Sequence, residues 1–202
     1  MSAVRPTILA IVASLGLGGA AFAQAPVQTR VRGAIDMIGA HEVRVVTRGG
    51  DKVTLKLPDD VTVTIIAPIA IDAIKPGSFI GTAAVTQPDG TLKALEIQVF
   101  PESMRGVGEG HRPWDLGAGS TMTNGTVGDL KVSNGRLLTL TYKGGEQKVF
   151  VPENAPVITY EPGSRAALRQ GAHVIVTATH NADETLTATR IGVGKDGMIP
   201  PM

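Results

Sequence analysis

The chain has 202 residues, of which 43% are hydrophobic and 18% charged, a composition that supports a folded core and excludes a wholly disordered chain. Lysine and arginine total 19 against 18 acidic residues, and this balance argues against partners such as nucleic acid or an anionic membrane, which require clustered positive charge. The sequence contains no cysteine, so the core must stabilise the fold without disulfides.

The first 23 residues have the three parts of a secretory signal peptide. Arg5 supplies a positive start, residues 7–17 form an apolar centre, and an Ala-Phe-Ala cleavage site ends at Ala23. This apolar centre is too short to span about 30 Å of hydrocarbon. We therefore expect cleavage of residues 1–23, export to the periplasm, and no membrane span in the mature chain.

One pattern occurs twice, in residues 31–100 and 124–193. The interval from Gly77 to Ala94 equals the interval from Gly171 to Ala188. Other matching positions are Gly33 and Gly125, Gly49-Gly50 and Gly144-Gly145, and Pro58-Asp59 and Pro152-Glu153. The predicted organisation is a first module at residues 24–100, an interdomain segment at 101–123, a second module at 124–193, and a flexible tail at 194–202.

Apolar residues alternate with polar ones within each copy, which is the pattern of β-strands. Val53, Leu55 and Leu57 alternate with Thr54 and Lys56. Turn sequences fall between such runs at residues 48–51, 89–90, 134–135 and 143–145, where they predict hairpin connections. The last strand of each copy changes phase, since the apolar pairs Ala94 and Ile97, and Ala188 and Ile191, are three residues apart. This spacing predicts a β-bulge in both copies.

A short helix is expected before the fourth strand of each copy. In the second copy it extends from a capping serine, Ser164, to a terminating glycine, Gly171, and in the first copy it occupies residues 69–75. Three strands, a short helix and two strands are the order of a five-stranded OB-like barrel. An SH3-like small barrel is the alternative, so the predicted fold is mostly β, with two tandem small barrels.

With these motifs the chain resembles uncharacterised bacterial periplasmic proteins built from tandem small OB-like β-barrel modules. The residues that carry the resemblance are residues 49–53, 75–79 and 89–97, with weaker versions in the second copy. The resemblance implies an envelope protein of two small barrels, and it assigns no functional residue.

The interdomain segment contains the only tryptophan, and its composition is unlike that of a flexible spacer. In one interpretation Trp114 packs between the barrels as a structural wedge, while Arg112 and Asp115 satisfy backbone groups. In the other, the segment recognises an envelope protein or a glycan, because Trp and Arg dominate binding hot spots. The candidate binding residues are Arg105, His111, Arg112, Trp114 and Asp115.

A soft-metal site is the alternative function. Met104, His111 and Met122 offer thioether and imidazole ligands that suit Cu(I), with Trp114 over the ion. Periplasmic copper chaperones built on a small OB barrel are similar in ligand types, although this chain has no tight Met-x-Met pair. No other cofactor is expected, and the scattered histidines lack the spacing of zinc ligands.

Catalytic motifs are missing from the sequence. No serine lies in a Gly-x-Ser-x-Gly turn, and the glycines at 106, 108 and 110 follow a proline instead of opening a helix after a strand.

Single-stranded nucleic acid binding needs aromatic platforms and a basic groove, which this composition does not provide. We predict a binding or accessory protein of the cell envelope that is not an enzyme; the oligomeric state stays open.

Overall fold

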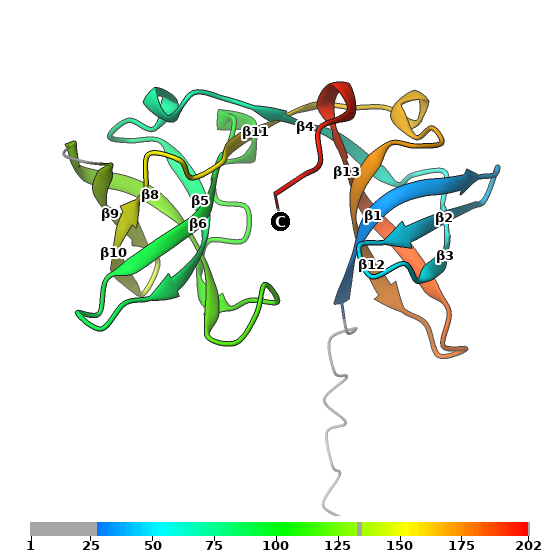
Figure 1. Ribbon diagram of the computed structural model, residues 1–202, viewed down its shortest axis with the longest axis horizontal. Helices are drawn as coiled ribbons and strands as arrows, with labels where there is room; N and C mark the ends of the chain where they lie inside the picture. The colour runs from blue at the N-terminus through cyan, green and yellow to red at the C-terminus, as the bar shows by residue number, and fades with distance from the viewer. Residues whose placement is uncertain (1–27, 133–134, 202) are drawn as a thin grey trace, which may run out of the picture.

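The computed structural model describes residues 28–132 and 135–201, which are mostly β-structure (Figure 1). The predicted signal peptide lies outside the described residues. The strands are β1 (Gln28–Ile38), β2 (Glu42–Thr47), β3 (Lys52–Lys56), β4 (Thr62–Pro68), β5 (Phe79–Thr86), β6 (Leu92–Val99), β7 (Gly110–Pro113), β8 (Ser120–Val132), β9 (Arg136–Tyr142), β10 (Gly145–Val151), β11 (Val157–Pro162), β12 (His173–His180) and β13 (Leu186–Gly194). Short 3-10 helices are η1 (Ile71–Ala73), η2 (Glu102–Met104), η3 (Arg165–Ala167) and η4 (Lys195–Gly197).

The predicted alternation is confirmed in β3, and two of the predicted hairpin turns are confirmed at Gly50 and Gly90. Leu55 is buried, whereas its neighbours Thr54 and Lys56 are exposed. Gly50 and Gly90 have φ of 93° and 83°, and they lie between the paired strands β2–β3 and β5–β6. Glycine adopts this left-handed conformation without the steric cost that a side chain imposes, so these turns can reverse the chain tightly.

Both predicted bulges are confirmed. The β5–β6 register passes from Glu96 to Ala94 where β5 advances by one residue, so Leu95 is the extra residue. The β12–β13 register does the same at Thr189. The phase change in the sequence therefore reports a real bulge at the equivalent place in both copies.

Each copy holds four strands, a 3-10 helix and two strands, one strand more than predicted before the helix. The predicted short helices are present only as the three-residue helices η1 and η3. Ser164 precedes η3, but its side chain forms no capping hydrogen bond, so the prediction of a capped helix is wrong. A single 3-10 turn leaves few free N–H groups for a cap to satisfy.

The two copies exchange strands. β1 pairs with both β2 and β12, and the first lobe consists of β1, β2, β3, β12 and β13. The second lobe consists of β5, β6, β8, β9 and β10. Residues 24–100 and 124–193 are therefore repeats in the sequence but not separate units in space. Because the copies share one strand pattern, β12 and β13 can take the place beside β1 that β5 and β6 would take in a consecutive arrangement.

Strands β4 and β11 carry the chain between the lobes (Figure 1). They pair with each other in antiparallel fashion, from Thr64 opposite Pro162 to Pro68 opposite Ile158. β4 also pairs in parallel with β13, and β11 in parallel with β6. The crossing strands thus join the lobes by backbone hydrogen bonds along their length.

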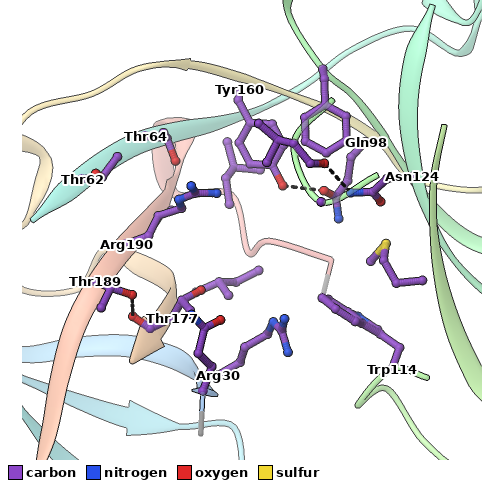
Figure 2. Close-up of a pocket in the computed structure, with 18 of the residues that line it drawn as sticks. Arg30, Thr62, Thr64, Gln98, Trp114, Asn124, Tyr160, Thr177, Thr189 and Arg190 are labelled. Carbon is purple, nitrogen blue, oxygen red and sulfur yellow. Dashed lines mark hydrogen bonds between the residues drawn. The ribbon is translucent and has the colours of Figure 1, made fainter. Parts of the chain in front are cut away.

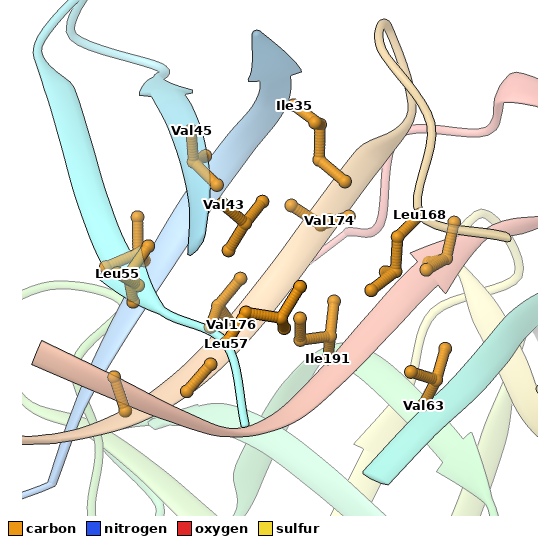
Figure 3. Close-up of a cluster of buried hydrophobic side chains, with 14 residues drawn as sticks. Ile35, Val43, Val45, Leu55, Leu57, Val63, Leu168, Val174, Val176 and Ile191 are labelled. Atoms are coloured by element: carbon orange, nitrogen blue, oxygen red, sulfur yellow. The ribbon is translucent and has the colours of Figure 1, made fainter. Parts of the chain in front are cut away.

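Each lobe has its own apolar core. In the first lobe, buried side chains of β1, β2, β3, β12 and β13 meet between the strands, together with Leu168 from the segment after η3 (Figure 3). In the second lobe, Leu138, Leu140 and Val149 pack against Ile80 and Ile97. Between the lobes lies a smaller group, here called the interlobe cluster: Ile66, Ala83, Met122, Ile158 and Ile175.

The end of the described chain lies between the lobes (Figure 1). Met198 packs against the interlobe cluster, and Pro200 is buried. Nη2 of Arg48 donates a hydrogen bond of 2.6 Å to the carbonyl of Pro200. The prediction of a flexible tail is therefore corrected for residues 194–201, because Met198 and Pro200 gain burial against the lobes.

Candidate functional site

A cleft of about 370 Å³ lies between the two lobes (Figure 2). One wall comes from β1, β4, β12 and β13, and the other from β6, β8, β11 and the segment around β7. The cleft is the candidate site, since ligand sites commonly lie where two parts of a protein meet.

Among the described residues, none of the helices has the length and the apolar character that crossing a membrane requires.

Strand alternation explains why the cleft walls are polar. Thr62, Thr64 and Ile66 of β4 line the cleft, whereas Val63 and Ile65 between them pack in the first-lobe core. Successive side chains of a strand point to opposite faces, so a face turned away from the core carries polar residues. β12 alternates in the same way, with Ile175 and Thr177 at the cleft and Val174 and Val176 in the core, so the walls combine polar and apolar side chains.

Trp114 reaches the cleft from the loop after β7 (Figure 2). Its backbone N–H donates to the carbonyl of Ser120 at 2.8 Å, and the Ser120 hydroxyl donates back to the Trp114 carbonyl at 2.9 Å. The indole packs against the interlobe cluster. The guanidinium of Arg30 lies 3.8 Å from the ring centroid and that of Arg112 lies 5.4 Å away, within the range of cation–π attraction.

Asp115 anchors this loop to the first lobe. Its carboxylate accepts two hydrogen bonds from Arg32 of β1, at 2.7 and 3.1 Å, and lies 3.7 Å from Arg30. Burial opposes ionisation of Asp115, but the hydrogen bond from Arg32 and the charges of Arg32 and Arg30 together lower its pKa below the usual value. The loop is therefore held across the lobe boundary by charge as well as by packing.

Positive charge dominates the cleft. Arg30, Arg112 and Arg190 line it, and no aspartate or glutamate is among the described residues that do so. The pKa of Arg112 is lowered by burial and by the charge of Arg30. The pKa of Arg30 is lowered by burial and by Arg32, although Asp115 opposes the shift. Arginines remain charged at these shifts, so the site presents a cluster of cations that one carboxylate balances only in part.

A buried polar chain borders the cleft on the second-lobe side. The hydroxyl of Tyr160 donates to Oε1 of Gln98 at 2.6 Å (Figure 2). Nε2 of Gln98 in turn donates to Oε1 of Glu96 at 2.8 Å. Glu96 is 1% exposed. Burial raises the pKa of Glu96 to about 7, although Gln98, Arg32 and Arg48 each oppose the shift.

The structure brings together only part of the predicted binding set. Arg112 and Trp114 line the cleft, and Asp115 lies beside it through its contacts with β1. Arg105 instead pairs with Glu102 and donates to the carbonyl of Gly77.

His111 also lies away from the cleft. Its Nδ1 forms a hydrogen bond of 2.8 Å with Thr123, and its ring stacks on Tyr142. The wedge interpretation agrees with the packing of Trp114 and with the bond from Arg112 to the carbonyl of Gly108, but Asp115 pairs mainly with arginines of β1.

The predicted copper ligands do not converge. In the β7–β8 pair, His111 is opposite Thr123 and Arg112 is opposite Met122, so His111 and Met122 point to opposite faces of the ribbon. Met104 lies in η2, outside both strands. Within the described part of the chain, no group of three or more histidines or carboxylates is placed to hold a metal ion. A copper site at these residues would need a rearranged ribbon, and it stays a prediction.

Sequence reasoning missed the half of the site that comes from other strands, chiefly Arg30, Arg190 and the threonines of β4. The polar positions of alternating strands carry the only signal for these residues, and that signal also fits a surface that faces solvent. These residues come to lie around the same cleft as Trp114 because β1 pairs with β12 and because β4 crosses between the lobes.

A sequence family described as Domain of unknown function (DUF5666) matches residues 149–192. The matched stretch begins in β10 of the second lobe, includes the crossing strand β11 and ends in β13 of the first lobe. The chain is similar to that family over this minor part of its length. No curated protein and no solved structure matches the chain.

Proposed function

We propose that this protein is an exported binding or accessory protein of the bacterial cell envelope, and that its ligand or partner binds in the interlobe cleft. The observation that carries the proposal is the place of Trp114, between Arg30 and Arg112 in a cleft lined by three arginines. Trp and Arg contribute most strongly to binding when they are partly desolvated at the centre of a site.

The size of the cleft supports binding of a small ligand or of a small part of a larger one. Its volume of about 370 Å³ lies at the lower end of the range for small-molecule sites. Its described lining residues include no carboxylate, imidazole or thiol that could act as a general acid, a base or a nucleophile. A binding role fits these residue types better than a catalytic one.

The proposed compartment rests on residues 1–23, which have the composition of a signal peptide. Expression of the full chain in a bacterial host, followed by osmotic shock and mass measurement of the released protein, tests it. We expect a mature form that starts at Gln24. Retention of Met1 in the cytoplasmic fraction would contradict export.

We also infer that each lobe is an OB-like small barrel assembled from both copies of the repeat. The short parallel pairings β3–β13 and β6–β10 support this interpretation, because each brings together the outer strands of one five-strand group. Hydrogen-exchange protection of Leu55 and Leu186 at this seam would support it, and rapid exchange there would contradict it.

The binding proposal is tested by the emission of Trp114, the only tryptophan in the chain. The mature protein is titrated with a panel of anionic, neutral and cationic small molecules and short peptides. We expect at least one anionic compound to change the emission saturably, and Arg112→Ala to weaken its affinity at least tenfold. A panel without any saturable response would overturn the proposal, and Arg169→Gln, which removes an exposed charge outside the cleft, is the control.

A further inference from the structure

The chemistry of the cleft walls narrows the class of ligand, and this inference rests on the proposed function. Two features of the walls are independent of each other: unbalanced arginine charge, and a set of hydroxyl and amide groups spread over both lobes. The hydroxyl and amide side chains are those of Gln28, Thr62, Thr64, Gln98, Asn124, Thr177 and Thr189.

We propose that the interlobe cleft binds a sugar unit that carries a carboxylate, as in oligosaccharides that contain uronic acids. The arginines pair with the carboxylate, while the threonine, asparagine and glutamine side chains bind the ring hydroxyls. The remainder of the oligosaccharide leaves the cleft towards solvent.

The arginine arrangement favours a carboxylate. Asp115 already pairs with Arg32 and Arg30, but no described carboxylate pairs with Arg112 or Arg190. Nη1 of Arg112 donates to the carbonyl of Gly108, which leaves other N–H groups of the fork available, and Arg190 is exposed. A guanidinium fork presents parallel N–H donors that match the two oxygens of a carboxylate.

The polar groups favour a ligand rich in hydroxyls. Thr64 Oγ1, Trp114 Nε1 and Asn124 Oδ1 are buried around the cleft, and none has a hydrogen-bond partner within the described residues. A buried polar atom without a partner costs free energy. Sugar hydroxyls both donate and accept, so they suit a wall that holds an indole donor, an amide acceptor and threonine hydroxyls together.

Aromatic surface and size agree with this ligand class. Trp114 and Tyr160 both line the cleft (Figure 2), as does Phe100, which stacks on Tyr160 with ring centroids 5.5 Å apart. These residues supply apolar atoms to the cleft lining, against which the C–H groups of a sugar can pack. A cleft of about 370 Å³ holds small ligands and not a folded domain.

An acidic peptide fits the same walls less well. Peptides commonly bind by adding a strand to a free sheet edge, where backbone groups supply hydrogen bonds. The cleft is instead lined by the faces of β4, β12 and β13, which are already paired on both sides. These strand faces present threonine side chains to the cleft, whereas their backbone N–H groups pair with neighbouring strands.

The experiment compares charged and neutral sugars by calorimetry and by Trp114 emission. The probes are disaccharides of galacturonate, mannuronate and glucuronate, each beside the neutral disaccharide of the same sugar and linkage. Succinate, inorganic phosphate and an acidic tetrapeptide complete the set. We expect at least one uronate disaccharide to bind saturably, and its neutral counterpart to bind at least tenfold more weakly.

The variant for this test is Arg190→Gln, because the exposed Arg190 side chain forms no hydrogen bond or ion pair with the described residues and its replacement should leave the fold intact. It should weaken binding of the uronate disaccharide at least tenfold, whereas the matched change Arg169→Gln should not. Equal binding of charged and neutral sugars, or tighter binding of succinate, phosphate or the peptide, overturns the sugar-acid proposal. Any of these results leaves the proposed binding function standing; failure of every ligand in both experiments removes both.

Discussion

Glu96 is a buried carboxyl group whose titration the fold changes. Its side chain is 1% exposed, it accepts one hydrogen bond from Gln98, and Oε2 has no partner within the described residues. Arg32 and Arg48 act on it from the first lobe, yet burial is the larger effect and raises its pKa from 4.5 to about 7. Burial therefore favours the neutral, protonated carboxyl of Glu96 in the folded state.

Glu96→Gln should remove this pH dependence. Because the folded pKa is raised, the folded state binds the proton more tightly than the unfolded chain, and the wild type loses stability as the pH rises from about 4.5 to about 7. Urea unfolding should find the variant more stable than the wild type at pH 8, by a free energy of the order of 3 kcal/mol, with little difference at pH 4. An equal difference at both pH values would contradict it, and the exposed Glu153→Gln serves as control.

Asp115→Asn tests the anchor of the Trp114 loop. The Asp115 side chain is 42% exposed, so the loss of its pairing with Arg32 should lower the free energy of unfolding by less than about 1 kcal/mol. Emission of Trp114 should nevertheless shift to longer wavelength, because the loop that carries the indole loses its contact with β1. Asp36→Asn removes a comparable pair with Arg44 inside the first lobe and should leave the emission unchanged. Unchanged emission in the Asp115 variant would show that packing alone positions the loop.

At the scale of elements, both copies place a glycine where two strands approach closely. A Cβ atom on Gly33 of β1 would lie 1.9 Å from the carbonyl oxygen of Val46 on β2. At the equivalent Gly125 of β8, it would lie 2.6 Å from the carbonyl oxygen of Thr141 on β9. The repeated glycine therefore permits the first strand of each copy to pass close to the second.

Gly33→Ala should destabilise the protein, because neither backbone can move without disturbing the β1–β2 pairing. We expect a loss of about 3 kcal/mol in the free energy of unfolding, at the upper end of the usual effect of overpacking. Gly49→Ala is the matched control, since the nearest atoms to its added Cβ lie 3.7 Å away, and it should change stability by less than about 0.5 kcal/mol. Equal effects of the two variants would contradict the close approach.

At the scale of the whole molecule, strand exchange makes each lobe depend on both halves of the chain. β1 and β12 are neighbours in space although most of the chain separates them in sequence. Contacts of such long sequence separation slow folding, because a large loop must close before they form. The exchange also creates the cleft, since β4 and β11 must cross from lobe to lobe.

Engineered disulfides distinguish exchange from a consecutive arrangement, and the absence of native cysteine keeps the test free of competing thiols. Gln28 is opposite Thr179 in the β1–β12 pair, so Gln28→Cys with Thr179→Cys should oxidise within one chain. In a consecutive arrangement the partner of Gln28 would be Val85, the equivalent residue of the first copy. Non-reducing electrophoresis and peptide mapping should find the first bridge and not the Gln28→Cys with Val85→Cys bridge; the reverse would contradict the exchange.

The sequence by itself determined the local structure: alternation predicted strands, glycine turns predicted hairpins, and the spacing from Ala94 to Ile97 predicted a bulge. It also singled out Trp114 and Arg112, because rare aromatic and charged residues in a glycine-rich segment are a local signal. These features depend on neighbouring residues, so periodicity is enough to find them.

Only the tertiary structure decided which strands pair and what the cleft contains. Two copies with one pattern fit beside each other in either arrangement, so the sequence could not choose between β5 and β12 as the partner of β1. The pairing of β1 with β12 places Arg30 against Trp114, with Arg190 in the same cleft. As a result, a polar strand face that could have faced open solvent lines the cleft. The physical reason is that alternation determines which side chains share a face of a strand, whereas what that face meets depends on pairing between residues far apart in the chain.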